Sequence, residues 1–461
     1  MSAGKFESHP YIPNSVPSVQ EEMLREIGAE GIDDFFKCIP DDIKFKGALE
    51  IPEAIPSEAG LKRHVENIAS KNKSVDKAIS FLGGGCWNHY VPATCDEING
   101  RSEFLTAYAG DPYEDHGRFQ ALFEYESMMA ELLEMDVVNV PTYDGSQAAG
   151  TALRMAGRIT GRSKALVPEL SSPDRMKIIK TYLHPQMDVV TVRADVKTLA
   201  ADLDDLRAKV GADTAAVFIE NPAFLGMIET RGEEISRIAH EAGALLVVWA
   251  DPSSLGVLTP PSGYGADIAC GDIQPLGVRM HFGGGRGGYI ASSDDEKFVR
   301  EYPSRLFGIA PTTHGEWGFG DVAWERTSFA GRENSKEFVG TAAALWGLTA
   351  GVYLATMGPR GMADLGGGIM RRAYYLAGEL AKIPGVSVAG NGPFFKEFPV
   401  KFSGVSVKEV NAALLERGIF GGHDLSPDYP SLPDTALYCV SETMTKSDMD
   451  ALVSALSDIL R

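Results

Sequence analysis

Three stretches in the middle of the chain decide the fold: residues 244–256 (ALLVVWADPSSLG), residues 265–277 (GADIACGDIQPLG) and residues 282–292 (FGGGRGGYIAS). The first two each hold a short apolar run bounded by turn residues, which predicts two buried strands. The first strand ends at an acid, Asp251, and the second leads into a polar turn that contains Gln274. No lysine occurs between Asp251 and Lys297. The acid and the missing lysine together are the most informative feature of the chain.

This order of strand, acid, second strand and glycine-rich segment resembles that of the fold-type I enzymes, which use pyridoxal phosphate (PLP). The resemblance implies that the acid pairs with the pyridinium nitrogen of the cofactor, and that a lysine in the following turn binds the cofactor as a Schiff base. Here Asp251 is present, but Gln274 stands at the position expected for the lysine. Because an amide cannot form an imine, we expect a PLP-enzyme fold that does not hold its cofactor covalently.

The region around these stretches alternates between apolar runs and amphipathic segments. The runs predict strands at residues 165–170, 188–194, 215–222, 245–251 and 267–272. Since single helical patterns separate most of them, the sequence predicts an α/β fold with a mainly parallel sheet covered by helices on both faces.

Changes in pattern along the chain predict three parts. Residues 1–74 read as a helical lead-in, and residues 75–330 form the large α/β domain. Residues 331–461 form a smaller α+β domain, with helices expected at 335–356, 362–383, 406–417 and 446–460 and strands at 386–390 and 437–442.

The composition narrows the class of protein. The formal net charge of -20 argues against nucleic acid and against an anionic membrane surface as partners. Five scattered cysteines without a CxxC pair fit a cytoplasmic protein, and the nine histidines show no metal-binding spacing, so no metal is expected. Residues 339–358 carry no charge, but they are rich in Gly, Ala and Thr. We therefore expect a buried helix there and not a membrane span.

Two glycine-containing motifs suggest anion sites. Gly283, Gly285 and Gly288 satisfy GxGxxG, but the residues that follow read as a strand, which disfavours a dinucleotide site. The turn at residues 143–150 (YDGSQAAG) precedes a predicted helix that begins near Gly145. Its N–H groups could hold an anion, although a well-capped core helix would look the same.

Longer segments give a more specific resemblance. They include residues 81–93 (FLGGGCWNHYVPA), 120–129 (QALFEYESMM), 220–229 (ENPAFLGMIE), 274–277 (QPLG), 353–361 (YLATMGPRG) and 393–398 (PFFKEF). Together they resemble the first subunit of the two-subunit glycine dehydrogenase (decarboxylating), the P-protein of the glycine cleavage system. The resemblance runs nearly end to end.

The resemblance implies a complex of two first and two second subunits, in which the second subunit binds PLP through a lysine. That complex decarboxylates glycine and passes the aminomethyl group to the lipoyl arm of the H-protein, while this chain completes the cleft and is not active alone. The resemblance also implies that this chain keeps a degenerate cofactor pocket, with Ser146, Gln147, Asp251 and Gln274 as its candidate residues. The candidates for the cleft or the subunit interface are His89, Tyr90, Arg101, Tyr108 and Arg305.

Two segments, residues 109–117 and 332–341, depart from the usual family pattern. They leave open a paralogous subunit that acts on another small amino acid or amine. A catalytically silent scaffold or regulator also stays open, as does an independent PLP enzyme that uses Lys297 or Lys336.

Overall fold

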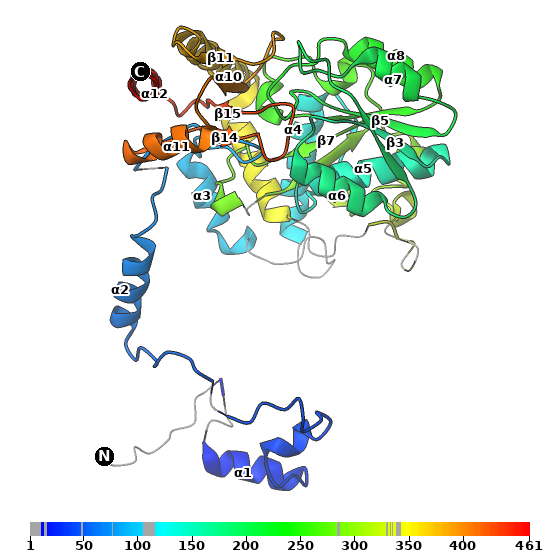
Figure 1. Cartoon of the computed structure of the whole chain (residues 1–461). Coiled ribbons are helices and arrows are strands. Elements are labelled where there is room, and N and C mark those ends of the chain that lie inside the picture. The colour runs from blue at the N-terminus through cyan, green and yellow to red at the C-terminus, as the bar shows by residue number, and fades with distance from the viewer. Residues whose placement is uncertain are drawn as a thin grey trace. The chain divides into compact units, whose positions relative to one another are not determined.

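The computed structural model describes residues 11–12, 16–47, 49–75, 77–104, 116–283, 286–328, 331, 333, 335–337 and 343–461. Contacts within the chain separate it into two units, residues 1–72 and residues 73–461. Figure 1 labels the elements of both.

In the described part of the first unit, the helical elements are α1 (Pro17–Glu26), the 3-10 helix η2 (Ile32–Phe36) and α2 (Glu58–Ala69). Ser57 caps α2, because its hydroxyl accepts a hydrogen bond from the N–H of Gly60. None of these three elements has a buried residue. Contacts within residues 1–72 therefore do not bury the apolar side chains of these elements.

A seven-stranded sheet forms the centre of the second unit, in the order β2-β8-β7-β6-β5-β3-β4. Its strands are β2 (Val137–Val138), β3 (Lys164–Pro168), β4 (Asp188–Val192), β5 (Thr214–Glu220), β6 (Leu245–Trp249), β7 (Ile268–Asp272) and β8 (Gly288–Ser292). The strands from β7 to β4 are parallel, whereas β8 is antiparallel to both β7 and β2. The predicted α/β fold with a mainly parallel sheet is confirmed. The strand that follows the glycine-rich segment is β8.

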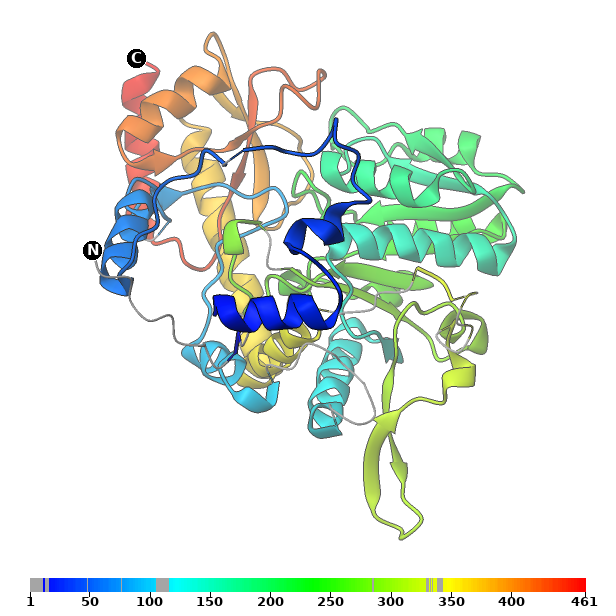
Figure 2. The same ribbon diagram turned by 90° about the horizontal axis from the view of Figure 1, so that it is seen from below.

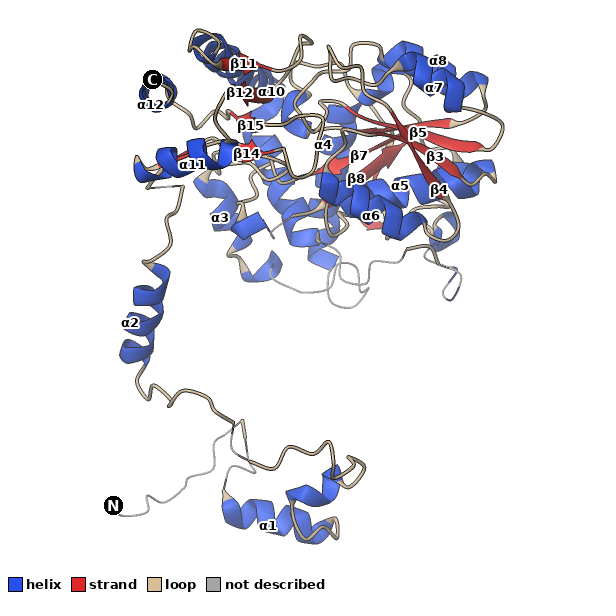
Figure 3. Cartoon of the chain, in the orientation of Figure 1, coloured by secondary structure: helices blue, strands red, loops and turns tan. Residues whose placement is uncertain are grey.

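Helices cover both faces of this sheet (Figure 3). On one face lie α5 (Gly145–Thr160) and α6 (Pro173–Leu183), and on the other lie α7 (Leu203–Lys209) and α8 (Gly232–Glu241). The alternation along β5 explains this layering, because Phe218 packs with the α5 side and Val217 and Ile219 pack with the α8 side. Helix α4 (His116–Leu133) packs against β2 and α10.

Helix α10 (Ala344–Leu380) links the sheet to the C-terminal part. It bends at Gly358, whose φ of 60° is left-handed, just before Pro359. Gly358 interrupts the helical backbone, so the break predicted between residues 356 and 362 is confirmed. The predicted start at Ser335 is wrong, since the described residues 335–337 are not helical.

The C-terminal part is α+β, as predicted. An antiparallel sheet in the order β11-β12-β15-β14 packs with α10, α11 (Val407–Glu416) and α12 (Lys446–Ile459). Its strands are β11 (Val386–Val388), β12 (Glu397–Phe402), β14 (His423–Asp424) and β15 (Thr435–Cys439). A short parallel pair, β1 (Ile79–Ser80) with β13 (Ile419–Phe420), joins this part to the segment that follows residue 73. The predicted boundary between residues 330 and 331 stays a prediction.

A β-hairpin projects from the second unit (Figure 2). It consists of β9 (Phe307–Pro311) and β10 (Trp317–Asp321), and Trp317 is 70% exposed. Other short helical elements in the described residues are α3 (Ala93–Asn99), η3 (Ser102–Phe104), η4 (Pro252–Ser254), η5 (Pro261–Tyr264), η6 (His281–Gly283), α9 (Glu296–Val299) and η7 (Trp324–Arg326). Within the described part of the chain, no helix is long and apolar enough to span a membrane.

Candidate functional site

The predicted acid lies at the carboxyl end of a central strand, where open α/β sheets place their ligands. Asp251 follows β6 and is 2% exposed. One oxygen, Oδ1, accepts hydrogen bonds from the N–H and the hydroxyl of Ser253, at 2.9 and 2.7 Å. The other oxygen, Oδ2, lies 2.6 Å from Nζ of Lys396. The acid is therefore already paired with a buried cation of its own chain.

Lys396 comes from the far end of the sequence, immediately before β12. Its side chain is 3% exposed, and its Nζ lies 3.4 Å from the centre of the Trp87 ring, as in a cation–π contact. Nζ also lies 3.1 Å from Nε2 of His89 and 3.4 Å from Oγ of Ser253. Four groups thus surround one ammonium.

His89 extends this network to a second carboxylate. Its Nδ1 lies 2.8 Å from Oε2 of Glu442, whose Oε1 accepts a hydrogen bond from the N–H of Tyr90 at 2.7 Å. Burial acts to raise the pKa of the Glu442 carboxyl. The hydrogen bonds from Nδ1 of His89 and from the Tyr90 N–H oppose burial and hold that pKa below its usual value. When Lys396 is protonated, Nε2 of His89 accepts from it and Nδ1 donates to Glu442.

The neighbour of Lys396 faces another environment. Glu397 is 5% exposed, and its Oε1 accepts a hydrogen bond from the N–H of Gly84 at 2.7 Å. Burial raises the pKa of Glu397 to about 7, although the charge of Lys396 opposes the shift.

Gln274 lies in the turn after β7 and is 1% exposed. Its Nε2 donates to the carbonyl oxygens of Trp87 and Val278, at 2.9 and 3.0 Å. Its Oε1 accepts from the N–H of Trp87 at 3.1 Å. The amide therefore fixes the backbone of Trp87, whose ring contacts Lys396.

The N-terminus of α5 meets carboxylates of the chain itself. Oδ2 of Asp272, at the end of β7, accepts from the N–H of Gly145 at 3.0 Å and from Nε of Arg286 at 2.7 Å. Burial raises the pKa of Asp272, and the charge of Arg286 opposes the shift. The Asp144 side chain caps the helix through the N–H of Gln147, so the helix starts where the sequence predicted.

The structure brings most of the predicted pocket residues together. Asp272 binds the backbone of both Gly145 and Gln274, and Gln274 binds Trp87 beside the Lys396–Asp251 pair. Ser146 and Gln147 are buried in the first turn of α5, where the Gln147 amide donates to Thr151.

The interface candidates are spread more widely. His89 joins the Lys396 network, and Tyr90 is 65% exposed at its edge. Arg101 is half-exposed near Glu103, and Arg305 binds Asp321 at the base of the β9–β10 hairpin through Nε and Oδ1 at 2.8 Å. Tyr108 lies outside the described residues, as does most of the divergent segment 109–117.

Sequence reasoning missed Lys396, Trp87, Asp272, Arg286 and Glu442. The adjacent charges of Lys396 and Glu397 inside the apolar run 393–400 (PFFKEFPV) were a usable signal, because paired charges in a buried strand need partners. The partner of Lys396, Asp251, could not be read from that signal.

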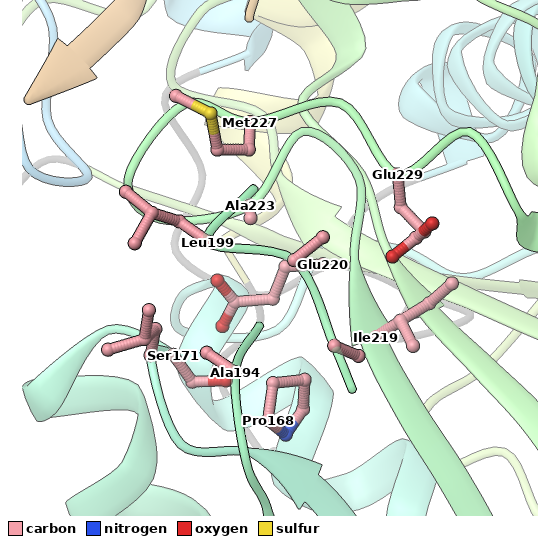
Figure 4. A pocket seen from close by; sticks show the side chains of 12 residues that line it. Pro168, Ser171, Ala194, Leu199, Ile219, Glu220, Ala223, Met227 and Glu229 are labelled. Atoms are coloured by element: carbon pink, nitrogen blue, oxygen red, sulfur yellow. The ribbon is translucent and has the colours of Figure 1, made fainter. Parts of the chain in front are cut away.

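Two cavities lie close to these elements. The cavity in Figure 4 lies where β3 and β5 end and is lined by Pro168, Glu220 and Met227 among others. Its volume of about 30 Å³ fits a water molecule and no substrate. A larger open basin of about 860 Å³ is bordered by His89, Tyr90 and Arg279. Among the described residues, no group of His, Cys, Asp or Glu side chains could hold a metal ion.

Comparison with known proteins places this geometry in a family. The family model described as glycine cleavage system P-protein matches residues 9–456. The chain belongs to the glycine cleavage system P-protein family. The chain is 39% identical to the probable glycine dehydrogenase (decarboxylating) subunit 1 of Staphylothermus marinus, with 99% of each chain covered. It is 38% identical to the protein of the same name from Pyrococcus furiosus, covering 98% of this chain and 99% of the relative.

Solved structures agree with this assignment. The crystal structure of an inhibitor-bound glycine decarboxylase (P-protein) matches with a TM-score of 0.85 and 34% identity, covering 98% of this P-protein family member and all of that chain. A sphingosine-1-phosphate lyase from Burkholderia pseudomallei matches with a TM-score of 0.65 and 15% identity, which shows the shared fold alone. The predicted family and the predicted fold-type I architecture are both confirmed.

The pocket of this chain does not fit PLP. Lys396 occupies the carboxylate of Asp251 that would pair with a ring nitrogen. The side-chain amide of Gln274 makes three hydrogen bonds, all to backbone groups of Trp87 and Val278. Asp272 holds the first N–H of α5, at the end of the pocket where a phosphate is expected.

Proposed function

We propose that this chain is the subunit of glycine decarboxylase that carries no cofactor, and that a lysine-bearing second subunit holds PLP. One observation carries the proposal: the buried ion pair between Lys396 and Asp251 fills the site that the cofactor would need. The relatives that match almost the whole chain are named subunit 1, which supports a second subunit.

The exposed apolar surface of the chain also supports a partner. On α2, the spacing of Leu61, Val65 and Ile68 puts them on one helical face, and no contact within residues 1–72 buries them. Trp317 on the projecting hairpin is 70% exposed. Such surface is typical of a subunit that is buried in a complex. A complex with two copies of each subunit fits this proposal.

In the proposed reaction the complex of the two subunits decarboxylates glycine. The electrons of the broken carbon–carboxylate bond reduce the lipoyl disulfide of the H-protein, and the aminomethyl carbon forms a bond with one of its sulfur atoms. PLP on the partner supplies the electron sink. This chain would complete the cleft and shape the path of the lipoyl arm, with His89, Tyr90, Arg101, Tyr108 and Arg305 as the candidate residues. Its five free cysteines fit a cytoplasmic location.

The decisive experiment is co-expression with the neighbouring lysine-bearing subunit, followed by glycine-dependent exchange of labelled bicarbonate in the presence of H-protein. We expect the two subunits together to exchange labelled bicarbonate, and neither subunit alone to do so. A stable pair that exchanges no glycine label would identify a paralogue for another small amino acid or amine. A chain that forms no complex would identify a silent scaffold, and exchange by this chain alone would overturn the proposal.

Charge reversal gives a sharper test of the interface. Arg305→Glu removes the pair with Asp321 at the base of the hairpin, whereas Arg300→Glu changes an exposed charge on the surface. We expect Arg305→Glu alone to weaken the complex or its turnover. Equal behaviour of the two variants would remove Arg305 from the interface.

A further inference from the structure

The charged side chains at the site expected for PLP are paired with one another. The two ends of this site carry opposite charges, and each charge already has a partner within the chain. PLP also carries two opposite charges, a protonated ring nitrogen at one end and a phosphate at the other.

At the cation end, the ammonium of Lys396 lies 2.6 Å from Asp251, at hydrogen-bond distance from the acid that would otherwise contact a ring nitrogen. The Trp87 ring and His89 complete the contacts of this ammonium, at 3.4 and 3.1 Å. Both side chains of the ion pair are 3% exposed. A carboxylate so deeply buried needs a cation, because an unpaired buried charge is strongly destabilising.

At the anion end, the Asp272 carboxylate takes the first N–H of α5 and the guanidinium of Arg286. A helix N-terminus and an arginine are the groups that bind a phosphate in proteins. Asp272 is 0% exposed, so it excludes other anions from these two donors.

We propose that Lys396 and Asp272 are internal substitutes for the ring nitrogen and the phosphate of PLP, and that they close the pocket of this subunit against the cofactor. The proposal rests on the proposed function in one respect, namely that this chain carries no cofactor. Asp251 is accordingly a cation site, and the ligand that fits it is a small primary ammonium ion. The α5 terminus with Arg286 is accordingly an oxyanion site.

Chemical rescue tests the cation site. Lys396→Ala removes the three outer methylenes and the ammonium, which together equal propylammonium. We expect propylammonium chloride to raise the unfolding midpoint of the full-length Lys396→Ala chain in a saturable way. Propanol and sodium chloride should have no such effect, and neither should propylammonium on the wild-type chain. Rescue that persists in Asp251→Asn/Lys396→Ala would overturn the assignment, as would no rescue in Lys396→Ala.

A second set of variants keeps the proposal testable if Lys396→Ala does not fold. Lys396→Met leaves the Asp251 charge unpaired, so its unfolding equilibrium constant should rise by about a hundredfold or more. Adding Asp251→Asn should recover most of that loss, since the buried charge is then gone. Equal losses in the single and double variants would contradict the ion-pair role of Lys396. Lys382→Met, which breaks an exposed pair with Glu379, is the matched control and should have little effect.

Inorganic phosphate tests the anion site. Asp272→Ser frees the Gly145 N–H and Arg286, so phosphate should stabilise this variant in a saturable way and leave the wild-type chain unchanged. Phosphate that stabilises both chains equally, or neither, would refute the role of Asp272. These readouts need no turnover, so a failed bicarbonate exchange with successful rescue would reject the proposed function and leave the two sites assigned.

Discussion

The buried carboxyl of Glu397 gives the most direct link between this structure and a measurement. Burial raises the pKa of Glu397 from 4.5 to about 7 in the folded chain. The folded chain therefore binds this proton more tightly than the unfolded chain. Stability from this group is complete below pH 4.5 and is lost as the pH rises from 4.5 to about 7, where the carboxyl ionises.

The size of the effect follows from the shift. At about 1.4 kcal/mol for each pKa unit, ionised Glu397 lowers the free energy of unfolding by about 3 kcal/mol above pH 7. About 2 kcal/mol of that loss falls between about pH 5.5 and about pH 8. Glu397→Gln cannot ionise, and its amide oxygen can still accept the Gly84 N–H.

Urea unfolding of the full-length chain at these two pH values measures the effect. The free energy of unfolding of Glu397→Gln, relative to that of wild type, should rise by about 2 kcal/mol between pH 5.5 and pH 8. Glu416→Gln, at the exposed end of α11, is the control and should follow the wild-type curve. A constant difference between Glu397→Gln and wild type at both pH values would refute the reasoning.

Three further predictions follow from individual contacts. Gln274→Lys should give no glycine exchange in the isolated chain and should lower its stability by about 1–3 kcal/mol, because the Trp87 N–H loses its acceptor; exchange activity would contradict this. Gly226→Ala should lower the free energy of unfolding by about 4 kcal/mol in urea titrations, since its φ is 88° and a Cβ would lie 1.7 Å from the Glu397 carbonyl oxygen. The control Gly161→Ala should lower it by only about 1 kcal/mol, because a Cβ there would have nothing within 4 Å. Leu61→Ser on the apolar face of α2 should weaken co-purification with the second subunit, and the neighbouring Lys62→Ser should not; equal pull-down would exclude that face from the interface.

Local patterns were enough to predict the architecture. Each strand from β3 to β7 coincides with an apolar run in the sequence, and α5 begins at the predicted position because Asp144 caps it. The interruption of α10 at Gly358 lies where the sequence predicted the end of one helix and the start of the next, and both helical segments pack in the same apolar cluster.

The sequence by itself determined the α/β fold, the family and the absence of a lysine between Asp251 and Lys297, because each depends on residue types at short spacing. It also showed the acid Asp251. Only the tertiary structure decided what that acid does, since Lys396 lies far along the chain and reaches Asp251 only because the fold brings the residue before β12 to the segment after β6. A buried charge takes its meaning from its partner, and the partner of a buried charge is set by the fold and not by the neighbouring sequence.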